Sequence, residues 1–247
     1  MKRPNKKEKQ KPTEIRLNRF IANAGVCSRR DADNLITEGK IKVNGKVVSE
    51  MGFKVGKMDK VEYKGRQLKS ETHRYFLLNK PSGFTTTMSD PHAKKTVMEL
   101  VDKACEERIY PVGRLDNPTT GLLLFTNDGE LAKKLTHPSH KVKKIYQVGL
   151  DKAITKDDFE KILNGVKLED GIATVNELAL VGEGGKDLGI EIHIGRNRIV
   201  RRIFESLGYK VKKLDRVMFA SLTKKNLPRG KFRPLSPKEI MGLKGIK

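Results

Sequence analysis

The stretch from Gly113 to Phe125 constrains the fold more than any other part of the chain. It begins with a polar loop bounded by glycines, Gly-Arg-Leu-Asp-Asn-Pro-Thr-Thr-Gly, and continues with four apolar residues, Leu-Leu-Leu-Phe. A short, wholly apolar run between turn signals indicates a buried strand. Catalytic side chains often lie on a loop that such a strand holds in place. Asp116 is therefore a candidate catalytic residue, although Asp, Asn and Pro are also ordinary turn residues.

The excess of basic residues points to a polyanionic partner. The 247 residues include 52 Lys and Arg against 30 Asp and Glu, a net charge of +22. Charge of this size concerns binding partners rather than fold, and nucleic acids and membrane surfaces are the natural polyanions. No apolar run approaches the ~18 residues that a membrane span needs. The basic N-terminus lacks the apolar run of a secretory signal. We therefore expect a nucleic-acid partner and no membrane.

Cysteine and histidine usage argues against metal chemistry. Cys27 and Cys105 are too few and too isolated for a disulfide framework or a metal cluster, which suits a reducing cytoplasm. The five histidines are scattered, and no His, Cys or Asp set has the spacing of a metal site. There is no nucleophile elbow and no Walker loop. We predict a cytoplasmic monomer without a metal or cofactor, acting through one carboxylate if it is an enzyme.

Composition and periodicity divide the chain into four segments. Residues 1–15 are basic and poor in apolar side chains, so we expect a disordered tail. Residues 16–68 predict a small domain, and the polar residues 69–73 a linker. Residues 74–247 predict more strands than helices, without regular alternation between them. That pattern favours an α+β domain on a mixed, mostly antiparallel sheet.

The small domain has clear local signals. Two short helices are predicted, the second beginning with Ser28-Arg29-Arg30-Asp31, which resembles a capping box. An Asn-Gly pair at residues 44–45 lies between alternating apolar residues and predicts a β-hairpin. Residues 55–63 predict a further strand pair. The expected unit is therefore two helices against a small sheet.

A basic stretch in the larger domain predicts a second RNA-binding surface. Residues 196–213 contain seven Lys or Arg and one Glu. Arg198, Arg201 and Arg202 have i, i+3, i+4 spacing, so a helix would place them on one side, opposite its apolar side. Such a face is either simply solvated or binds RNA. The charge of the whole chain leads us to interpret it as an RNA face.

The run "RLNRFIANAGVCSRRDADNLITEGKIKVNGKVV" resembles the alpha-L RNA-binding module. This module occurs in a small-subunit ribosomal protein, in tyrosyl-tRNA synthetases and in several RNA-modifying enzymes, and it binds structured RNA with its two helices. The resemblance makes five basic residues candidate RNA contacts: Arg16, Arg19, Arg29, Arg30 and Lys42. Contacts of this kind bind phosphates and position a protein without reading sequence.

The segments "VGRLDNPTTGLLLFTNDGELAKKL", "KIYQV" and "GRNRIVRRIFESLGYKVKKLDRV" resemble the RsuA/RluB branch of the RNA pseudouridine synthases. The Gly-Arg-Leu-Asp-x-x-Thr-x-Gly-Leu-Leu pattern is highly specific to that superfamily. With the RNA-binding module, the resemblance covers about residues 16–243. It is strongest to the branch members that act on large-subunit ribosomal RNA. One departure is Ile199, where relatives commonly have Gln.

The resemblance implies roles for individual residues. Asp116 matches the catalytic aspartate, Tyr146 the active-site tyrosine and Arg201 the arginine that pairs with the aspartate. An Asp is already anionic near neutral pH, and a nearby Arg would hold it so. Further residues are expected to shape the loop or to bind RNA: Arg114, Thr119, Arg198 and Arg202.

The implied reaction converts uridine to pseudouridine in ribosomal RNA. The expected substrate is large-subunit RNA in its precursor or free form. The N-glycosidic bond breaks, and the freed uracil rotates and rejoins the ribose through carbon, without a cofactor. Asp116 would act either by covalent attack or by taking a proton from the ribose, and both routes stay open. Two alternatives also stay open: a synthase for tRNA or small-subunit RNA, and a non-catalytic RNA-binding assembly factor.

Overall fold

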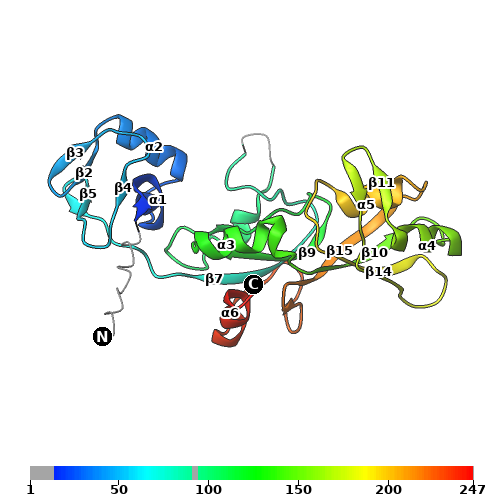
Figure 1. Cartoon of the computed structure of the whole chain (residues 1–247). Coiled ribbons are helices and arrows are strands. Elements are labelled where there is room, and N and C mark those ends of the chain that lie inside the picture. The colour runs from blue at the N-terminus through cyan, green and yellow to red at the C-terminus, as the bar shows by residue number, and fades with distance from the viewer. Residues whose placement is uncertain (1–13, 91–93, 247) are drawn as a thin grey trace, which may run out of the picture. The chain divides into compact units, whose positions relative to one another are not determined.

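The computed structural model describes residues 14–90 and 94–246. The chain forms two compact units, Met1–Thr72 and His73–Lys247, and each is described here by itself (Figure 1). The predicted basic tail of residues 1–15 lies outside the described residues except for its last two. None of the helices in the described part of the chain is long and apolar enough to cross a membrane.

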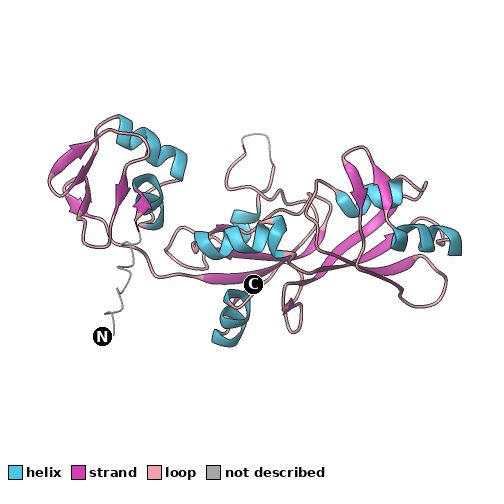
Figure 2. Ribbon diagram, viewed as in Figure 1, coloured by secondary structure: helices cyan, strands magenta, loops and turns pink. Residues whose placement is uncertain are grey.

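The N-terminal unit packs two helices against short strands (Figure 2). Its elements are β1 (Ile15–Arg16), α1 (Leu17–Asn23), α2 (Arg29–Thr37), β2 (Ile41–Val43), β3 (Lys46–Val48), β4 (Lys54–Val55), β5 (Val61–Tyr63) and β6 (Arg66–Gln67). The core is formed by one apolar face of each helix and by inward residues of the strands: Leu17, Ile21, Ala32, Ile36, Ile41, Val43, Val55 and Val61. Burying these faces holds together helices that are too short to be stable alone.

In the N-terminal unit the sequence predicted the helix cap and the hairpin correctly, but not the pairing of the other strands. The Ser28 side chain accepts a hydrogen bond from the backbone N–H of Asp31, as its capping role requires. Asn44 and Gly45 both have positive φ, which confirms the hairpin between β2 and β3. The strand pair predicted within residues 55–63 is wrong, because β4 pairs with β1 and β5 pairs with β2 and β6. The extended residues of β1 were not anticipated, so the partner of β4 was missed.

The C-terminal unit is built on one large sheet. Its elements are β7 (Tyr75–Lys80), η1 (Val97–Leu100), β8 (Tyr110–Pro111), β9 (Thr120–Thr126), α3 (Gly129–Thr136), η2 (Pro138–His140), β10 (Lys144–Leu150), α4 (Lys156–Asn164), β11 (Val166–Leu168), β12 (Gly171–Ala173), β13 (Glu177–Leu180), β14 (Asp187–Ile192), α5 (Ile199–Glu205), β15 (Val211–Phe219), β16 (Leu222–Thr223), β17 (Phe232–Pro234) and α6 (Pro237–Lys244). The main path runs β13-β14-β10-β15-β9-β7-β17. Its neighbours are antiparallel except for the parallel pair β9 and β15, which confirms the predicted mixed, mostly antiparallel sheet and the α+β class.

The neighbouring strands β7 and β9 are buried on both faces. Successive side chains of a strand point to opposite faces, so each strand feeds two cores. Leu123 and Phe125 join the core that α4 and α5 cover, while Leu122 and Leu124 join the core of α3 and α6. All four are completely buried, which confirms the strand predicted after the Asp116 loop.

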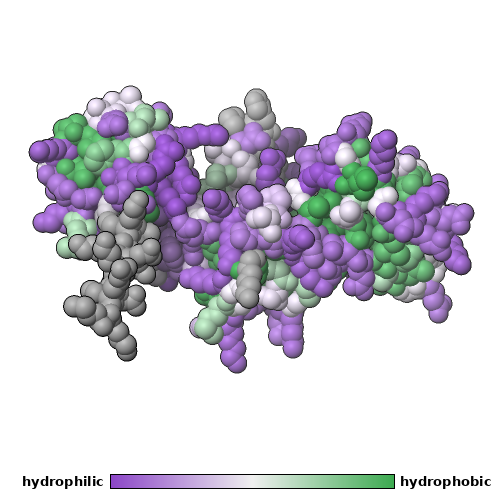
Figure 3. Space-filling view, viewed as in Figure 1, coloured by the Kyte–Doolittle hydropathy of each residue, from purple (hydrophilic) through white to green (hydrophobic). Residues whose placement is uncertain are grey.

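The surface in view is mainly hydrophilic, as the charge of the chain requires (Figure 3). Exposed apolar side chains of the C-terminal unit include Leu163, Ile172, Leu180 and Val181. Leu163 of α4 is 43% exposed although it is apolar. The inward line of α4 runs instead through Phe159 and Ile162, and Leu163 lies one residue, about 100°, further around the helix.

Candidate active site

A buried lysine that the sequence analysis missed holds the Asp116 loop. Lys80, at the end of β7, is completely buried. Its Nζ donates to the main-chain carbonyl oxygens of Pro81, Asp116, Asn117 and Thr119, at 3.2, 3.1, 3.0 and 2.8 Å. Burial lowers the pKa of Lys80 to about 8, while the charge of Asp116 opposes this shift, so the ammonium stays protonated at neutral pH. One cation therefore fixes the backbone from the candidate catalytic residue to Thr119.

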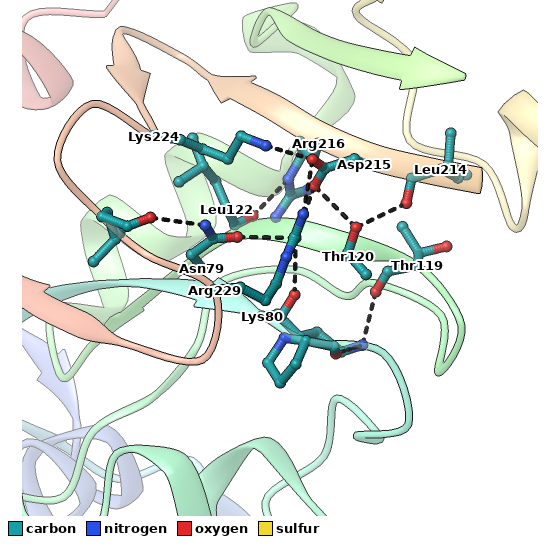
Figure 4. A network of polar contacts seen from close by, with 12 residues as sticks. Asn79, Lys80, Thr119, Thr120, Leu122, Leu214, Asp215, Arg216, Lys224 and Arg229 are labelled. Carbon is teal, nitrogen blue, oxygen red and sulfur yellow. Dashed lines mark hydrogen bonds and ion pairs between the residues drawn. The ribbon is translucent and has the colours of Figure 1, made fainter. Parts of the chain in front are cut away.

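A second polar network anchors the loop where it joins the sheet (Figure 4). Thr120 donates to Oδ1 of Asp215, and Arg229 donates to both oxygens of the same carboxylate at 3.0 Å. Lys224 also donates to Asp215, and Arg229 reaches across to Oδ1 of Asn79 on β7. Burial by itself raises the pKa of Asp215, but these cations outweigh it and lower the pKa. The start of β9 is thus tied to both neighbouring strands.

Gly121 permits the close approach of β9 and β15 beneath the loop. Its φ is +106°, and a Cβ at this position would lie 2.3 Å from the carbonyl oxygen of Arg216. No side chain fits at that distance, so glycine is required there. The loop can therefore enter the sheet directly beside β15, the strand that carries Arg216 into the site.

Asp116 and Tyr146 line one cavity of about 420 Å³. This volume is within the usual range of small-ligand sites. Asp116 comes from the loop, and Tyr146 comes from β10, where it lies opposite Arg216 of β15 and Ile190 of β14. Tyr146 is 8% exposed, so its ring forms part of the cavity wall rather than of the outer surface. The structure therefore brings together two of the three predicted catalytic residues, 30 positions apart in sequence.

The sequence predicted that Arg198, Arg201 and Arg202 share one face of a helix. In the structure they do not. Arg198 precedes α5 in a left-handed conformation with φ 45°, so the periodicity of the helix does not set its direction. Its Nη1 lies 3.9 Å from Oδ2 of Asp116, and its Nη2 lies 3.3 Å from Glu205. The salt bridge predicted for Arg201 is thus made by Arg198 in this structure.

Arg201 lies behind the site in a buried position. Its Nη1 donates to the carbonyl oxygen of Val211 at 2.8 Å, while Nε is buried and has no hydrogen-bond partner among the described residues. Burial and the charge of Arg198 lower the pKa of Arg201, and the charge of Asp116 opposes them. The charge of Asp116 therefore acts on Arg201 although no direct salt bridge joins the two side chains. The Nε donor of Arg201 is unused among the described residues.

Arg202 is held by an acidic residue that the sequence analysis missed. Its guanidinium donates to the two carboxylate oxygens of Asp170 at 2.5 and 3.0 Å. Arg196 donates to the carboxylate and the carbonyl oxygen of the same residue at 3.0 and 2.9 Å. The hydrogen bonding of Arg202, followed by the charges of Arg196 and Arg202, lowers the pKa of Asp170 to about 2. Two nitrogens of Arg202 are therefore engaged by Asp170, which also fixes the loop that carries Arg198.

The remaining predicted RNA contacts differ in exposure. Thr119 is 2% exposed, so it contributes to the cavity wall rather than to an outer surface, and its Oγ1 has no partner among the described residues. Arg114 is exposed on the same loop. In the N-terminal unit Arg19 is half-buried, and four of the basic side chains are exposed: Arg16, Arg29, Arg30 and Lys42.

Comparison with known families adds the deciding observation. Residues 74–206 match the RNA pseudouridylate synthase family, and residues 15–61 match the S4 domain. The chain belongs to the RNA pseudouridine synthase family. It is an enzyme that isomerises uridine in RNA, and the cavity around Asp116 lies almost entirely within the matched catalytic region.

Full-length relatives support this membership. A Bacillus subtilis protein named ribosomal large subunit pseudouridine synthase B is 43% identical, with 94% of this chain and 96% of the relative aligned. An Aquifex aeolicus protein described as an uncharacterized RNA pseudouridine synthase is 41% identical, over 93% and 94%. A crystal structure of a pseudouridylate synthase superposes with a TM-score of 0.67 at 29% identity, covering 93% of this chain and 99% of that one. The similarity to these relatives thus extends over nearly the whole chain, including both matched regions.

Neutralising Asp170 is expected to lower the turnover of this pseudouridine synthase by about 10-fold, a change of about 1.4 kcal/mol in the activation barrier. In Asp170→Asn the guanidinium groups of Arg196 and Arg202 lose their counter-ion, so the loop that places Arg198 beside Asp116 loosens. Steady-state kinetics should show kcat falling more than KM rises. Glu169→Gln is the matched control, because Glu169 is exposed and makes neither contact. A kcat equal to that of the control would contradict this role.

Proposed function

We propose that this enzyme converts one uridine of large-subunit ribosomal RNA to pseudouridine, as a cytoplasmic monomer that contributes to ribosome biogenesis and needs no cofactor. The observation that carries the proposal is the cavity in which one carboxylate, Asp116, lies beside Tyr146. Two relatives named ribosomal large subunit pseudouridine synthase B, from Bacillus subtilis and Pseudomonas aeruginosa, support the choice of RNA. The second is 38% identical over 93% of this chain and 61% of the relative.

The proposed chemistry begins with a uridine flipped out of the RNA into the cavity. Flipping costs a few kcal/mol, and stacking on an aromatic ring such as Tyr146 supplies about 1–3 kcal/mol. Asp116 then either attacks the ribose C1′ or takes a proton from C2′. Arg198 lies 3.9 Å from the carboxylate and orients it. The Nε of Arg201, which has no partner among the described residues, is proposed as a further donor at this site.

The RNA outside the cavity is proposed to bind the exposed basic side chains of both units. In the S4 domain these are the four exposed candidates and the half-buried Arg19. On the catalytic unit, Arg114 is the exposed candidate next to the Asp116 loop, and Arg198 is partly exposed at the cavity. Such contacts give affinity and register but little sequence discrimination. The choice of uridine is therefore assigned to the fit of the flipped base and its neighbours in the cavity.

The substrate proposal is tested by mapping pseudouridine in every stable RNA of a strain that lacks the gene. We expect one site to disappear from the large-subunit ribosomal RNA, and to return when the purified enzyme is incubated with that RNA in a chelating buffer. Loss of a site in tRNA or small-subunit RNA would overturn the choice of substrate. Unchanged RNA together with an inactive purified protein would favour the assembly-factor alternative.

A further inference from the structure

Two cations in the cavity wall, the buried Arg216 and the partly buried Lys144, have no acidic partner among the described residues. Arg216 is 3% exposed, donates from Nε to the carbonyl oxygen of Leu122 at 2.8 Å, and has its guanidinium carbon 4.6 Å from the centre of the Phe219 ring. Its Nη2 is buried and has no hydrogen-bond partner in the described part of the chain. The guanidinium is therefore held firmly while one of its donor nitrogens stays unused.

Lys144, at the start of β10, is likewise held by main-chain carbonyl groups and has an unused donor. Its Nζ donates to the carbonyl oxygens of Val142 and His193, both at 3.0 Å. An ammonium has three N–H donors, so one remains for a ligand. Burial, and then the charge of Arg216, lowers the pKa of Lys144 to about 8. The lysine is thus mainly protonated at neutral pH and repelled by its neighbour.

The free-energy cost of placing Lys144 and Arg216 in the cavity wall without a counter-ion suggests that the ligand supplies an anion. Within residues 14–90 and 94–246, neither Lys144 nor Arg216 forms a salt bridge with a carboxylate. Burying cations without counter-ions is expensive, and unsatisfied buried donors are rare in folded proteins. Strongly shifted groups in a cleft are typical of functional sites. Lys144 and Arg216 therefore favour the binding of a negatively charged group that the described residues do not supply.

Both cations lie beside the proposed stacking residue. Arg216 is directly opposite Tyr146 in the antiparallel register of β10 and β15, and Lys144 precedes Tyr146 by two residues on the same strand. All three line the cavity, in which Asp116 is the one acidic residue among the lining side chains of the described chain. A uracil stacked on Tyr146 is consequently next to two cations, whereas the ribose faces the carboxylate.

We propose that Lys144 and Arg216 contact the uracil and stabilise the negative charge that it carries when its bond to the ribose breaks. This inference rests on the proposed function. In either route open to Asp116, the electron pair of the C1′–N1 bond stays on the base, which becomes an anion with charge on N1, O2 and O4. C5 then donates a pair to C1′. In the covalent route the bond between C1′ and Asp116 breaks and the carboxylate leaves with its electron pair, and in the other route Asp116 returns its proton to C2′. The C5 proton is lost and N1 takes up a proton, so atoms and charges balance.

The physical effect is that of an oxyanion hole. Donors and charges that are fixed in place before the reaction stabilise developing charge without reorganisation, and loss of one such donor typically lowers the rate about 10²–10³-fold. The anchoring of Arg216 by Leu122 and Phe219, and of Lys144 by two carbonyl groups, supplies that fixed geometry. The two residues act on the leaving base, a task separate from that of Asp116 at the ribose.

The test varies the leaving group. Fluorine at C5 withdraws electrons and stabilises the uracil anion, so a 5-fluorouridine substrate depends less on the enzyme for this stabilisation. Loss of the N-glycoside is measured under single-turnover conditions on RNA containing uridine or 5-fluorouridine. We expect Lys144→Gln and Arg216→Lys to lose about 10²-fold on uridine, and about 10-fold or less on 5-fluorouridine. The ratio of the two rates is taken on one preparation, so it does not depend on the folded fraction.

The matched control is Lys143→Gln, one residue earlier, because the Lys143 ammonium pairs with Glu191 and is not part of the cavity wall. Its rate ratio should equal that of the wild type. Equal losses on the two substrates in both cavity variants would overturn the inference and leave these residues a structural role only. The wild-type enzyme is measured first on the uridine RNA. This rate tests the proposed function by itself, because an inactive wild-type enzyme would contradict the proposed function and not the role of Lys144 and Arg216.

Discussion

Asp116→Asn should lower the rate of uridine isomerisation by about four orders of magnitude or more, which corresponds to about 5.5 kcal/mol of activation free energy. An amide can neither attack C1′ nor take a proton from C2′, so both routes fail. The loop itself should persist. Lys80 holds it through backbone carbonyl oxygens, and Thr86 holds it through the backbone of Leu115, so none of these contacts uses the carboxylate.

This prediction is checked by single-turnover kinetics together with RNA binding and thermal unfolding of the same variant. We expect RNA affinity and the melting temperature to stay close to those of the wild type. Asp102→Asn is the control, since Asp102 is an exposed carboxylate of the same unit outside the cavity. If Asp116→Asn turned over within 10-fold of this control, another group would have to begin the reaction.

The elements around Asp116 could be predicted because their signals are local. The apolar run after the loop reports burial directly, and the buried β9 confirms it. Local patterns could not predict that Asp116 and Tyr146 line one cavity. The strands β9 and β10 are separated in the sheet by β15, which comes much later in the chain. Only the resemblance to a family placed these two residues in one site before the structure did.

The error over the arginines has a simple geometric cause. Spacing at i, i+3 and i+4 predicts a common face only when all three residues are helical. Arg198 is the residue before α5 and has positive φ, so it turns toward Asp116 while Arg201 is buried. Arg202 turns to Asp170, in the turn between β11 and β12, which no local pattern connects to it.

The missed residues owe their roles to tertiary neighbours. Lys80, Lys144 and Arg216 bind main-chain carbonyl groups, and a carbonyl leaves no mark in the sequence because every residue has one. Basic residues are also abundant in this chain, so nothing distinguishes a buried lysine from the many that serve the RNA surface. Buried cations in a highly basic protein are thus the feature that sequence patterns are least able to reveal.

Lys80→Met should destabilise the catalytic unit by about 3 kcal/mol or more and reduce turnover. Methionine fills similar space but leaves four carbonyl groups without their shared donor, and an unsatisfied buried group costs about 1–3 kcal/mol. For a unit of this size the melting temperature should fall by about 6 °C or more. Thermal unfolding and hydrogen exchange at the amides of the Asp116 loop measure the two effects.

The loss of activity in this variant should appear at temperatures where the unit is still folded, because the backbone from Asp116 to Thr119 is freed before the sheet unfolds. The kcat should then fall more than RNA affinity. Lys231→Met serves as the matched control, since Lys231 is an exposed lysine next to β17, the strand that pairs with β7. Retention of both the melting temperature and kcat in Lys80→Met would show that the Asp116 loop is held by the Asp215 and Thr86 contacts alone.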